Sequence, residues 1–459
     1  MKIKKSLIYL LGVLLVFSIY GCKEKIEEEE IIPEPEPVEL SISPETALRW
    51  SDLTLQVIKN SPNNSPTYAS RSLGYFGLTM YESTVKGSII FKSITSDLTG
   101  LGATPAPEEG QEMNWEIALN AGQKEIINSI FPHAPIEIKE KIDSLYKLIK
   151  EEKLAQLVSQ STIDASDVYG KLVARQIFEW SKLDNGHEGF LKTFDFDYNY
   201  PTGRTYWSPP VAGQSSIAAP MHPYWGNNRT FAKANTDMEI PVFMESDNDP
   251  SSQYYKDMML VYEINKNLTQ EEKEIALWWG DDPAVSASPP GHSYYLTASL
   301  IKEKQNNLFE ATSAFAKVGM SAADAFINVW KCKYFYHAER PKNFISRNID
   351  GRFVQFWPEP PFPAFTSGHS SQIAATATAM IDVFGNETKI IDDFHTGRPW
   401  DSIRKVEFKT RTFDTIWELA EECGYSRILG GIHTPQDNTV GLDEGIKIGN
   451  NIIAFNWKY

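Results

Sequence analysis

The chain has 459 residues, of which 42% are apolar and 12% aromatic, enough for a large core and incompatible with a wholly disordered protein. Its 44 basic and 60 acidic residues give a net charge of −16, which argues against a nucleic-acid binder, because neutralising phosphates requires a basic surface. Three cysteines cannot build a disulfide framework or a cysteine-rich zinc site, and we expect Cys332 and Cys423 to be buried thiols.

The first 22 residues have the features of a secretion signal. Three lysines precede an apolar run over 7–20 that is too short for a comfortable membrane span. The run ends in Ser-Ile-Tyr-Gly-Cys22, which resembles the cleavage and acylation box of bacterial lipoproteins; a plain signal peptide with an incidental cysteine is the alternative. We therefore expect a signal peptide over 1–22, lipid attachment at Cys22, and an outer-membrane lipoprotein of a Gram-negative bacterium facing the periplasm or the cell surface.

The segment 23–45 is predicted to be an acidic, Pro/Glu-rich tether. Residues 23–40 hold eight glutamates and two lysines, and since like charges repel and proline stiffens the backbone, this stretch should be extended. From 46 to 459 helical patterns dominate, strand-like alternation is scarce and no repeat of fixed period is present. The sequence therefore predicts an all-α fold with one large helical domain after the tether.

Helices are predicted where apolar residues recur at three- and four-residue steps. The ranges are 49–60, 68–86, 114–130, 136–159, 164–180, 253–265, 269–279, 292–304, 309–336, 368–384, 411–424 and 435–454. The Pro- and Gly-rich stretch from about 198 to 250 is predicted to be a long ordered loop with short turns. Loops of that length usually line a site or cover a surface.

Three segments stand apart from this helical background. The first runs from Lys333 to Arg340 and Pro341; the two cations are two helical turns apart and are expected on one face of a helix that the proline ends. The second, Ser367-Gly-His369, starts a helix of small residues, and the free N–H groups and dipole of such a start form an anion site.

The third segment contains Arg427, His433 and Asp437, and Thr434 or Asp437 is expected to start the last helix, with Asp437 placed to orient His433. Together the segments supply two arginines, a lysine, a hydroxyl, backbone donors and two histidines. This set suits an oxyanion, because a divalent cation needs carboxylates, or imidazoles without guanidinium groups around them.

Lys-x6-Arg-Pro, Ser-Gly-His and Ser-Arg-x5-His-x3-Asp, in this order, resemble the three-part signature of the vanadium haloperoxidases and the type 2 phosphatidic acid phosphatases. The long helical lead-in also resembles bacterial haloperoxidases. The resemblance implies a helical-bundle domain over 46–459 of the haloperoxidase and acid phosphatase type, with the signature within 330–437, and vanadate as cofactor. Thr366 is a departure, because the family usually has proline before Ser-Gly-His.

The resemblance also implies a role for each matching residue. His433 would be the axial vanadium ligand with Asp437 behind it, and His369 would be the acid–base residue near the opposite apical oxygen. Trp330 and Phe362 match aromatic positions on the halide side of the pocket, although ordinary packing explains many aromatics. Vanadate would be held by Lys333, Arg340, Ser367, Gly368, His369, Arg427 and His433, and the catalytic group would be Lys333, His369, His433 and Asp437.

The function that the resemblance favours is a haloperoxidase that oxidises halide with hydrogen peroxide to hypohalous acid, with small organic acceptors and no nucleic-acid partner. Iodide is the expected halide, because it needs the least oxidising power and Phe362 leaves few polar groups near the reacting oxygens. The membrane would be reached only through the N-terminal lipid anchor. The sequence leaves the oligomeric state open.

Two alternatives use the same residues. An acid phosphatase would form a phosphohistidine on His433 and use His369 to protonate the leaving group. A non-catalytic protein that captures phosphate or vanadate would keep the cations without needing either histidine.

The remaining polar residues carry weaker expectations. Asp281 and Asp282 are an acidic partner for Lys333 or a plain loop turn, with neither favoured. His337 is expected to be structural or at the rim of the site. No function is expected for the other histidines, which are His133, His187, His222, His292 and His395.

Overall fold

The described part of the chain begins beyond the predicted secretion signal. The computed structural model describes residues 38–459 except 212 and 284. The predicted signal peptide over 1–22, the lipid-bearing Cys22 and the tether up to residue 37 lie outside the described residues and stay predictions.

The described residues are mostly helical, and the predicted all-α class is confirmed. Short polar residues cap many of the helices, as Ser65 does for α2 and Asn307 for α10 by accepting hydrogen bonds from the first backbone N–H groups. The helices are α1 (Glu45–Asn60), α2 (Pro66–Thr84), α3 (Trp115–Ile130), α4 (Ile136–Ala155), α5 (Gln160–Ser181), α6 (Lys233–Thr236), α7 (Gln253–Lys266), α8 (Gln270–Trp278), α9 (Ser288–Lys304), α10 (Leu308–Tyr336), α11 (Pro341–Asn348), α12 (Gly368–Phe384), α13 (Ile416–Leu429) and α14 (Pro435–Ile453).

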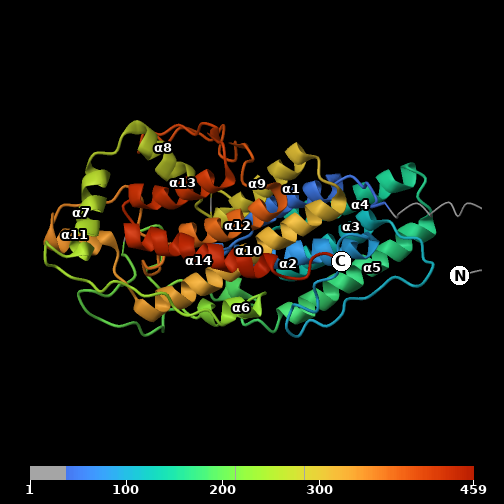
Figure 1. Ribbon diagram of the computed structural model, residues 1–459, viewed down its shortest axis with the longest axis horizontal. Helices are drawn as coiled ribbons and strands as arrows, with labels where there is room; N and C mark the ends of the chain where they lie inside the picture. The colour runs from blue at the N-terminus through green and yellow to red at the C-terminus, as the bar shows by residue number, and fades with distance from the viewer. Residues whose placement is uncertain (1–37, 212, 284) are drawn as a thin grey trace, which may run out of the picture. The chain divides into compact units, whose positions relative to one another are not determined.

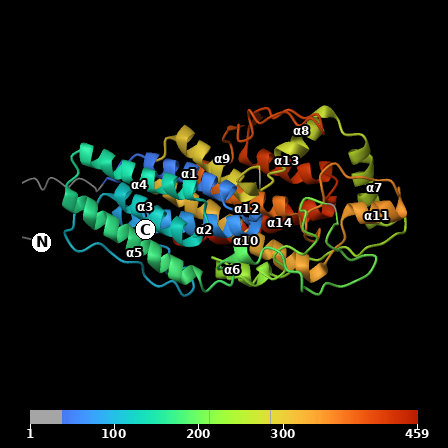
Figure 2. The same ribbon diagram turned by 180° about the vertical axis from the view of Figure 1, so that it is seen from behind.

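Helix α10 lies at the centre of the core. It is apolar nearly all round and is buried along most of its length, as expected of a helix surrounded by others. It packs against α2 and α12, and α12 packs against α14 (Figures 1 and 2). Gly319 of α10 and Gly445 of α14 permit these close approaches, because a Cβ at either position would lie 2.4 Å from a backbone oxygen, that of Leu73 or Ser371.

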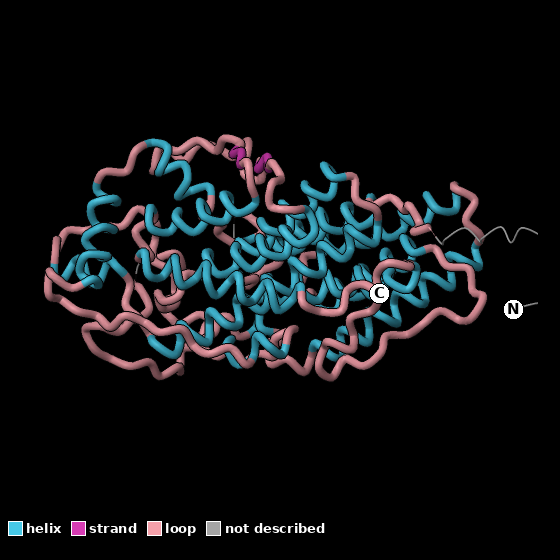
Figure 3. The backbone as a smooth tube through the Cα atoms, in the orientation of Figure 1, coloured by secondary structure: helices cyan, strands magenta, loops and turns pink. Residues whose placement is uncertain are grey.

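One pair of short strands interrupts the helical architecture. The predicted helix over 411–424 begins too early: Arg411–Phe413 forms strand β2, which pairs antiparallel with β1 (Ile390–Asp392), and Figure 3 shows this pair apart from the helices. Thr415 then caps α13 by accepting from Glu418 N–H, so the helix cannot start before this residue. The helical spacing of apolar residues did not reveal the strand, which is only three residues long.

The end of α10 corrects a second expectation. The helix stops at Tyr336, and His337 adopts a left-handed conformation with φ of 50°. Arg340 is therefore extended and precedes α11, a short helix that the sequence did not predict and that starts with Pro341 in a favoured first position. Lys333 and Arg340 do not share a helix face, although both reach the same site.

The predicted long loop is confirmed as mostly irregular; its described residues include the short turn Trp225–Asn227, α6 and isolated bridges at Tyr206 and Met221. Over the described residues, no helix combines the length and the apolar composition that crossing a membrane requires.

Candidate functional site

Three buried cations, which we call the cationic cage, define the site: Lys333, Arg340 and Arg427. Their exposed fractions are 0%, 1% and 1%. Within the described residues none of them pairs with a carboxylate, and the Nε atoms of both arginines have no hydrogen-bond partner. Burying charge without a counter-charge is costly, so the cage needs an anion between its members.

Lys333, at the end of α10, holds the loop that leads into α12. Its Nζ donates to the carbonyl oxygens of Pro363, Ala364 and Thr366 at 2.9, 2.7 and 2.6 Å. Burial, with the charge of Arg340, brings the pKa of Lys333 well below its usual value. The lysine thus fixes the loop before Ser367 at the cost of a desolvated charge, which a bound anion would stabilise.

Arg340 links this loop to His433. Its Nη2 donates to the carbonyls of Phe362 and Pro363, and its Nη1 donates to Ile432 O and, at 3.0 Å, to Nε2 of His433. Arginine cannot accept a hydrogen bond, so Nε2 carries the lone pair and the imidazole is neutral. Burial and the nearby cations also favour the neutral ring, because they lower the pKa of His433 well below its usual value.

The predicted pairing of His433 with Asp437 is confirmed. His433 Nδ1 donates to Asp437 Oδ2 at 2.9 Å, and the same carboxylate oxygen accepts from Thr434 N–H in a capping box that starts α14. Burial raises the pKa of Asp437 to about 6, against the opposing effect of the Thr434 N–H and Lys333. The carboxylate fixes both the tautomer and the direction of the His433 ring.

The start of α12 supplies uncharged donors. Ser367 is the N-cap: its Oγ accepts from the N–H of Ser370 and is hydrogen-bonded to the Ser370 hydroxyl at 2.7 Å, and that hydroxyl also bonds to Asn438 Oδ1. The backbone N–H of Ser367 donates to Asp437 O at 3.0 Å, so the positive ends of α12 and α14 meet at the site. Two helix N-termini beside three cations form a strong anion site.

Trp279, just after α8, positions His369 and Arg427. Its carbonyl accepts from Arg427 Nη1 at 3.2 Å and also opposes the lowering of the His369 pKa. The Nε2 atom of His369 has no partner within the described residues. Burial and the charge of Arg427 set the pKa of His369 well below its usual value, so this ring is neutral and keeps an unused nitrogen.

A cavity of about 450 Å³ opens onto the site. His369, Arg427 and His433 line one end of it, and Trp330 and Phe362 form part of its wall. The two aromatic rings lie 4.8 Å apart, as neighbours in one cluster. The structure therefore brings the predicted anion-binding residues and the predicted halide-side aromatics to one place.

Asp281 and Asp282, in the turn after α8, do not form the contact with Lys333 that was one of the two alternatives for them. Asp281 accepts from His292 Nδ1 at 2.9 Å and from His395 Nε2 at 2.8 Å, rather than pairing with Lys333. The other nitrogen of His292 donates to Asp392, on β1, at 3.0 Å. Asp282 accepts from Gln214 instead. The expectation of an acidic partner for Lys333 in this turn is wrong.

The sequence analysis missed this buried network of Asp281, His292, Asp392 and His395, because its members come from three separate segments. Three of them are close enough to share a metal ion. However, Arg398 donates to Nδ1 of His395, so Nε2 of that ring carries its proton and donates to Asp281 rather than offering a lone pair. The network therefore acts as a hydrogen-bonded anchor for the turn that follows Trp279.

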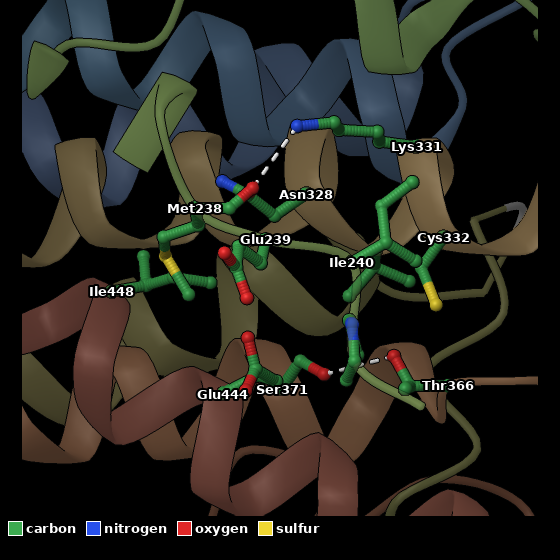
Figure 4. A pocket seen from close by; sticks show the side chains of 12 residues that line it. Met238, Glu239, Ile240, Asn328, Lys331, Cys332, Thr366, Ser371, Glu444 and Ile448 are labelled. Carbon is green, nitrogen blue, oxygen red and sulfur yellow. Dashed lines mark hydrogen bonds between the residues drawn. The ribbon is translucent and has the colours of Figure 1, made fainter. Parts of the chain in front are cut away.

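His337, Cys332 and Cys423, which the sequence analysis also named, do not line the cavity beside the cationic cage. His337 is bonded to the hydroxyl of Tyr198 at 2.9 Å, and both Cys332 and Cys423 are buried free thiols, as predicted. Cys332 borders a recess of about 10 Å³ between α10, α12 and α14, where Lys331 donates to Met238 O (Figure 4). This recess is too small for a substrate.

Vanadate fits the residues present. A tetrahedral or trigonal-bipyramidal oxyanion would meet the unpartnered Nε atoms of Arg340 and Arg427, the hydroxyl of Ser367 and the α12 N-terminus. The lone pair of His433 Nε2 offers the nitrogen ligand that a metal centre needs. A divalent cation does not fit, because the cage would repel it.

The comparisons with known proteins show which fold the chain has. Residues 353–459 match the family model described as the VCPO second helical-bundle domain. The chain is similar to a solved bacterial vanadium-dependent iodoperoxidase, with 24% identity, a TM-score of 0.75 and coverage of 92% of this chain and 97% of the other. No curated protein matches by sequence.

Two further solved structures, the holo and apo forms of a bacterial vanadium-dependent chloroperoxidase, share 16% identity with the chain. Their TM-scores are 0.65 and 0.62, over 90% and 85% of this chain and 98% and 93% of the other. The chain therefore has the fold of the vanadium-dependent haloperoxidases, and the fold expected from the resemblance is confirmed.

Proposed function

We propose that this chain, with the fold of the vanadium-dependent haloperoxidases, binds vanadate and oxidises halide with hydrogen peroxide to hypohalous acid. The observation that carries the proposal is the cationic cage, whose three buried cations form no ion pair within the described residues and lie beside the neutral His433. A bound oxyanion would pair directly with all three cations.

Each residue has a definite task in this proposal. Lys333, Arg340 and Arg427 would neutralise the oxygens of vanadate, with Ser367 and the Gly368 backbone donating hydrogen bonds. His433 would supply the nitrogen ligand, held by Asp437. When bound, vanadate acts as a Lewis acid that activates hydrogen peroxide toward halide without changing its own oxidation state.

His369 is the residue suited to proton transfer. It lines the cavity, and its Nε2 is free of protein partners within the described residues. A neutral imidazole there can accept a proton from hydrogen peroxide as it enters, and return it to the leaving oxygen.

Iodide is the halide that we propose. Phe362 presents an apolar ring 5.3 Å from Lys333 Nζ and 5.4 Å from Arg340 Cζ, and its ring offers no hydrogen-bonding group to the anion. A site without an additional donor at this position has less means to increase the oxidising power of the bound group. Iodide is the easiest halide to oxidise and so places the least demand on the site.

The phosphatase alternative has one observation in its favour. The neutral His433, whose Nε2 lone pair accepts from Arg340 of the cationic cage, has the protonation state that a nucleophilic histidine needs. The wide apolar cavity and the aromatic Trp330 and Phe362 favour the peroxidase, because a phosphatase does not need an apolar wall beside its leaving group.

One side-by-side assay tests the proposal. Purified protein loaded with orthovanadate is assayed for oxidation of iodide, bromide and chloride, and vanadate-free protein is assayed with p-nitrophenyl phosphate. We expect vanadate-dependent iodide oxidation that Arg427→Ala removes and that Arg352→Ala, a change at an exposed arginine, leaves intact. Phosphate-ester hydrolysis without any vanadate-dependent iodide oxidation would establish the alternative.

We also propose that Cys22 carries a lipid and anchors the enzyme to the outer membrane, on the periplasmic or surface side. The support is the sequence of residues 1–22 and the acidic segment that follows. Metabolic labelling with a radioactive fatty acid should mark the wild-type protein and not Cys22→Ala. Equal labelling of both would contradict the lipid anchor.

A further inference from the structure

A second large cavity has no part in the reaction proposed above. It has a volume of about 600 Å³ and lies between the segments 185–197 and 222–228, and we call it the loop hollow. No residue of the cationic cage, and neither His369 nor His433, is among its described lining residues. Its volume is within the range of roughly 300–1,000 Å³ that is typical of pockets for organic ligands.

Hydrogen bonds join the two segments that form the loop hollow. The backbone N–H of His222 donates to Thr193 O at 3.0 Å, and its ring Nε2 donates to Gly189 O at 3.0 Å. Asn185 Nδ2 donates to Asn227 O at 3.1 Å, further along both segments. These bonds hold the irregular backbone in place before a ligand arrives, so binding costs little ordering of the protein.

Apolar side chains gather on the wall of the loop hollow. Leu191, Phe196 and Tyr224 line it, and they are 67%, 77% and 60% exposed. Single exposed apolar residues are ordinary, but several around one cavity form a patch, and such patches mark binding sites. The more buried Phe194 and Trp225 add two further aromatic rings to the lining. The wall therefore offers ring surface to a ligand.

Polar side chains share this wall with the rings. Asn185 and Asn227 bring amides, and Asp195 and Asp197 bring carboxylates, against the single lysine of the described lining, Lys192. An excess of carboxylates repels an anionic ligand such as a phosphate or sulfate ester. Amides both donate and accept hydrogen bonds and carboxylates accept them, which suits hydroxyl groups, since a hydroxyl also does both.

Two buried donors of the lining residues have no acceptor. They are Trp225 Nε1 and Asn228 Nδ2, on residues that are 5% and 7% exposed, and neither has a hydrogen-bond partner within the described residues. A buried donor without an acceptor is costly. A ligand rich in oxygen atoms can supply the missing acceptors, whereas a hydrocarbon or an organic cation cannot.

We propose that the loop hollow binds a neutral oligosaccharide. A sugar ring has an apolar face of C–H groups, which packs on the exposed rings of Phe196 and Tyr224, and a rim of hydroxyls, which pair with the amides and carboxylates. The site binds and does no chemistry, and it holds the protein on a hydroxyl-rich glycan. This inference goes beyond the proposed halide oxidation and does not depend on it.

Binding is measured on the full-length, vanadate-free protein by calorimetry. The probes are neutral hexasaccharides of glucose, mannose, galactose and xylose, with choline chloride as an organic cation. We expect saturable binding of at least one of the sugars and none of choline. A phosphorylated sugar should bind more weakly than its neutral counterpart, because the carboxylates of Asp195 and Asp197 repel it.

A matched pair of variants then locates the site. Phe196→Ala/Tyr224→Ala removes two exposed rings of the wall and should weaken sugar binding at least about tenfold. The control Phe335→Ala/Tyr459→Ala removes rings that are 62% and 84% exposed outside this lining, and it should bind like the wild type. Both variants should keep the wild-type thermal midpoint, since exposed side chains contribute little to folding.

Three results would overturn the inference. They are the absence of saturable binding for all of the sugars, sugar binding that Phe196→Ala/Tyr224→Ala leaves unchanged, and choline binding as tight as that of the sugar. The last would identify a site for organic cations, which aromatic rings and carboxylates also bind. Because no vanadate is present, the result does not depend on haloperoxidase activity, and failure of either proposal leaves the other standing.

Discussion

The backbone N–H of Ser367 donates to the carbonyl oxygen of Asp437 at 3.0 Å, and this bond joins the starts of α12 and α14. The side chain of Asp437 orients His433 from the same residue. One residue therefore sets the distance between two of the three signature segments and the direction of the nitrogen that faces the anion. The site depends on this junction more than on any single helix.

The junction gives a prediction for Asp437→Asn. This change keeps the backbone bond to Ser367 and the side-chain volume, and it removes the negative charge that holds His433. Loss of such a supporting carboxylate typically costs about 10–100-fold in metal affinity, so vanadate binding measured by calorimetry should weaken by that factor. Asp443→Asn, at an exposed position of α14, is the control and should bind normally. Unchanged affinity in Asp437→Asn would show that the cage alone orients vanadate.

Replacing His433 and replacing His369 should have different effects on vanadate binding and on turnover. His433→Ala removes the only proposed nitrogen ligand, so vanadate retention and iodide oxidation should both be lost, although the cage can still hold the anion loosely. His369→Ala should retain most vanadate affinity while turnover falls by roughly 10²–10⁴-fold, the usual contribution of a general acid–base residue.

Calorimetric vanadate titration beside steady-state iodide oxidation distinguishes the two. Loss of vanadate in His369→Ala with retention in His433→Ala would exchange the two roles. If both variants oxidised iodide like the wild type, the assignment of the site itself would be wrong.

Phosphate should stabilise the vanadate-free protein, because it presents the same oxygens to the cationic cage. At a phosphate concentration of 100 times its Kd, linkage gives roughly 2.7 kcal/mol, which should appear as a rise of the thermal midpoint. Arg340→Ala should remove the rise, and the exposed Arg352→Ala should keep it. Phosphate added before vanadate should also inhibit iodide oxidation. A midpoint insensitive to phosphate in the wild type would mean that the cage does not bind this anion.

The sequence predicted which residues come together more accurately than it predicted the backbone conformation around them. Helix caps and apolar spacing identified α10, α12 and α14, because these signals are local. The spacing from Lys333 to Arg340 suggested one helix face, but His337 ends the helix through a left-handed conformation that helical periodicity does not encode. The site forms nevertheless, since Arg340 reaches it from the extended segment before α11.

The network around Asp281 could not be predicted in the same way. His292 lies on α9, Asp392 on β1 and His395 in the loop beyond it, so their meeting depends on tertiary packing rather than on any local pattern. The only sequence signal is the presence of two acidic residues after Trp279. That signal was consistent with a partner for Lys333 or with a plain loop turn; in the structure Lys333 donates to three backbone carbonyls instead.

His292 should make stability depend on pH on the alkaline side. Burial lowers the pKa of His292, but the carboxylates of Asp392 and Asp281 outweigh this effect and raise it to about 10. The unfolded chain releases the same proton near a pKa of about 6.5. This contribution is therefore fully present below about pH 6.5 and is lost as pH rises toward 10, by up to about 1.4 kcal/mol per pH unit.

Urea unfolding between about pH 7 and about pH 9 measures how steeply the free energy of unfolding falls with pH. In His292→Gln/Asp392→Asn, which removes one positive and one negative charge together, the protein should be less stable and the slope smaller by about that amount. His187→Gln, at a partly exposed loop histidine, is the control and should keep the wild-type slope. If the double variant loses stability with pH as steeply as the wild type, His292 is not the proton-holding group, and the Asp281 turn is held by neutral hydrogen bonds alone.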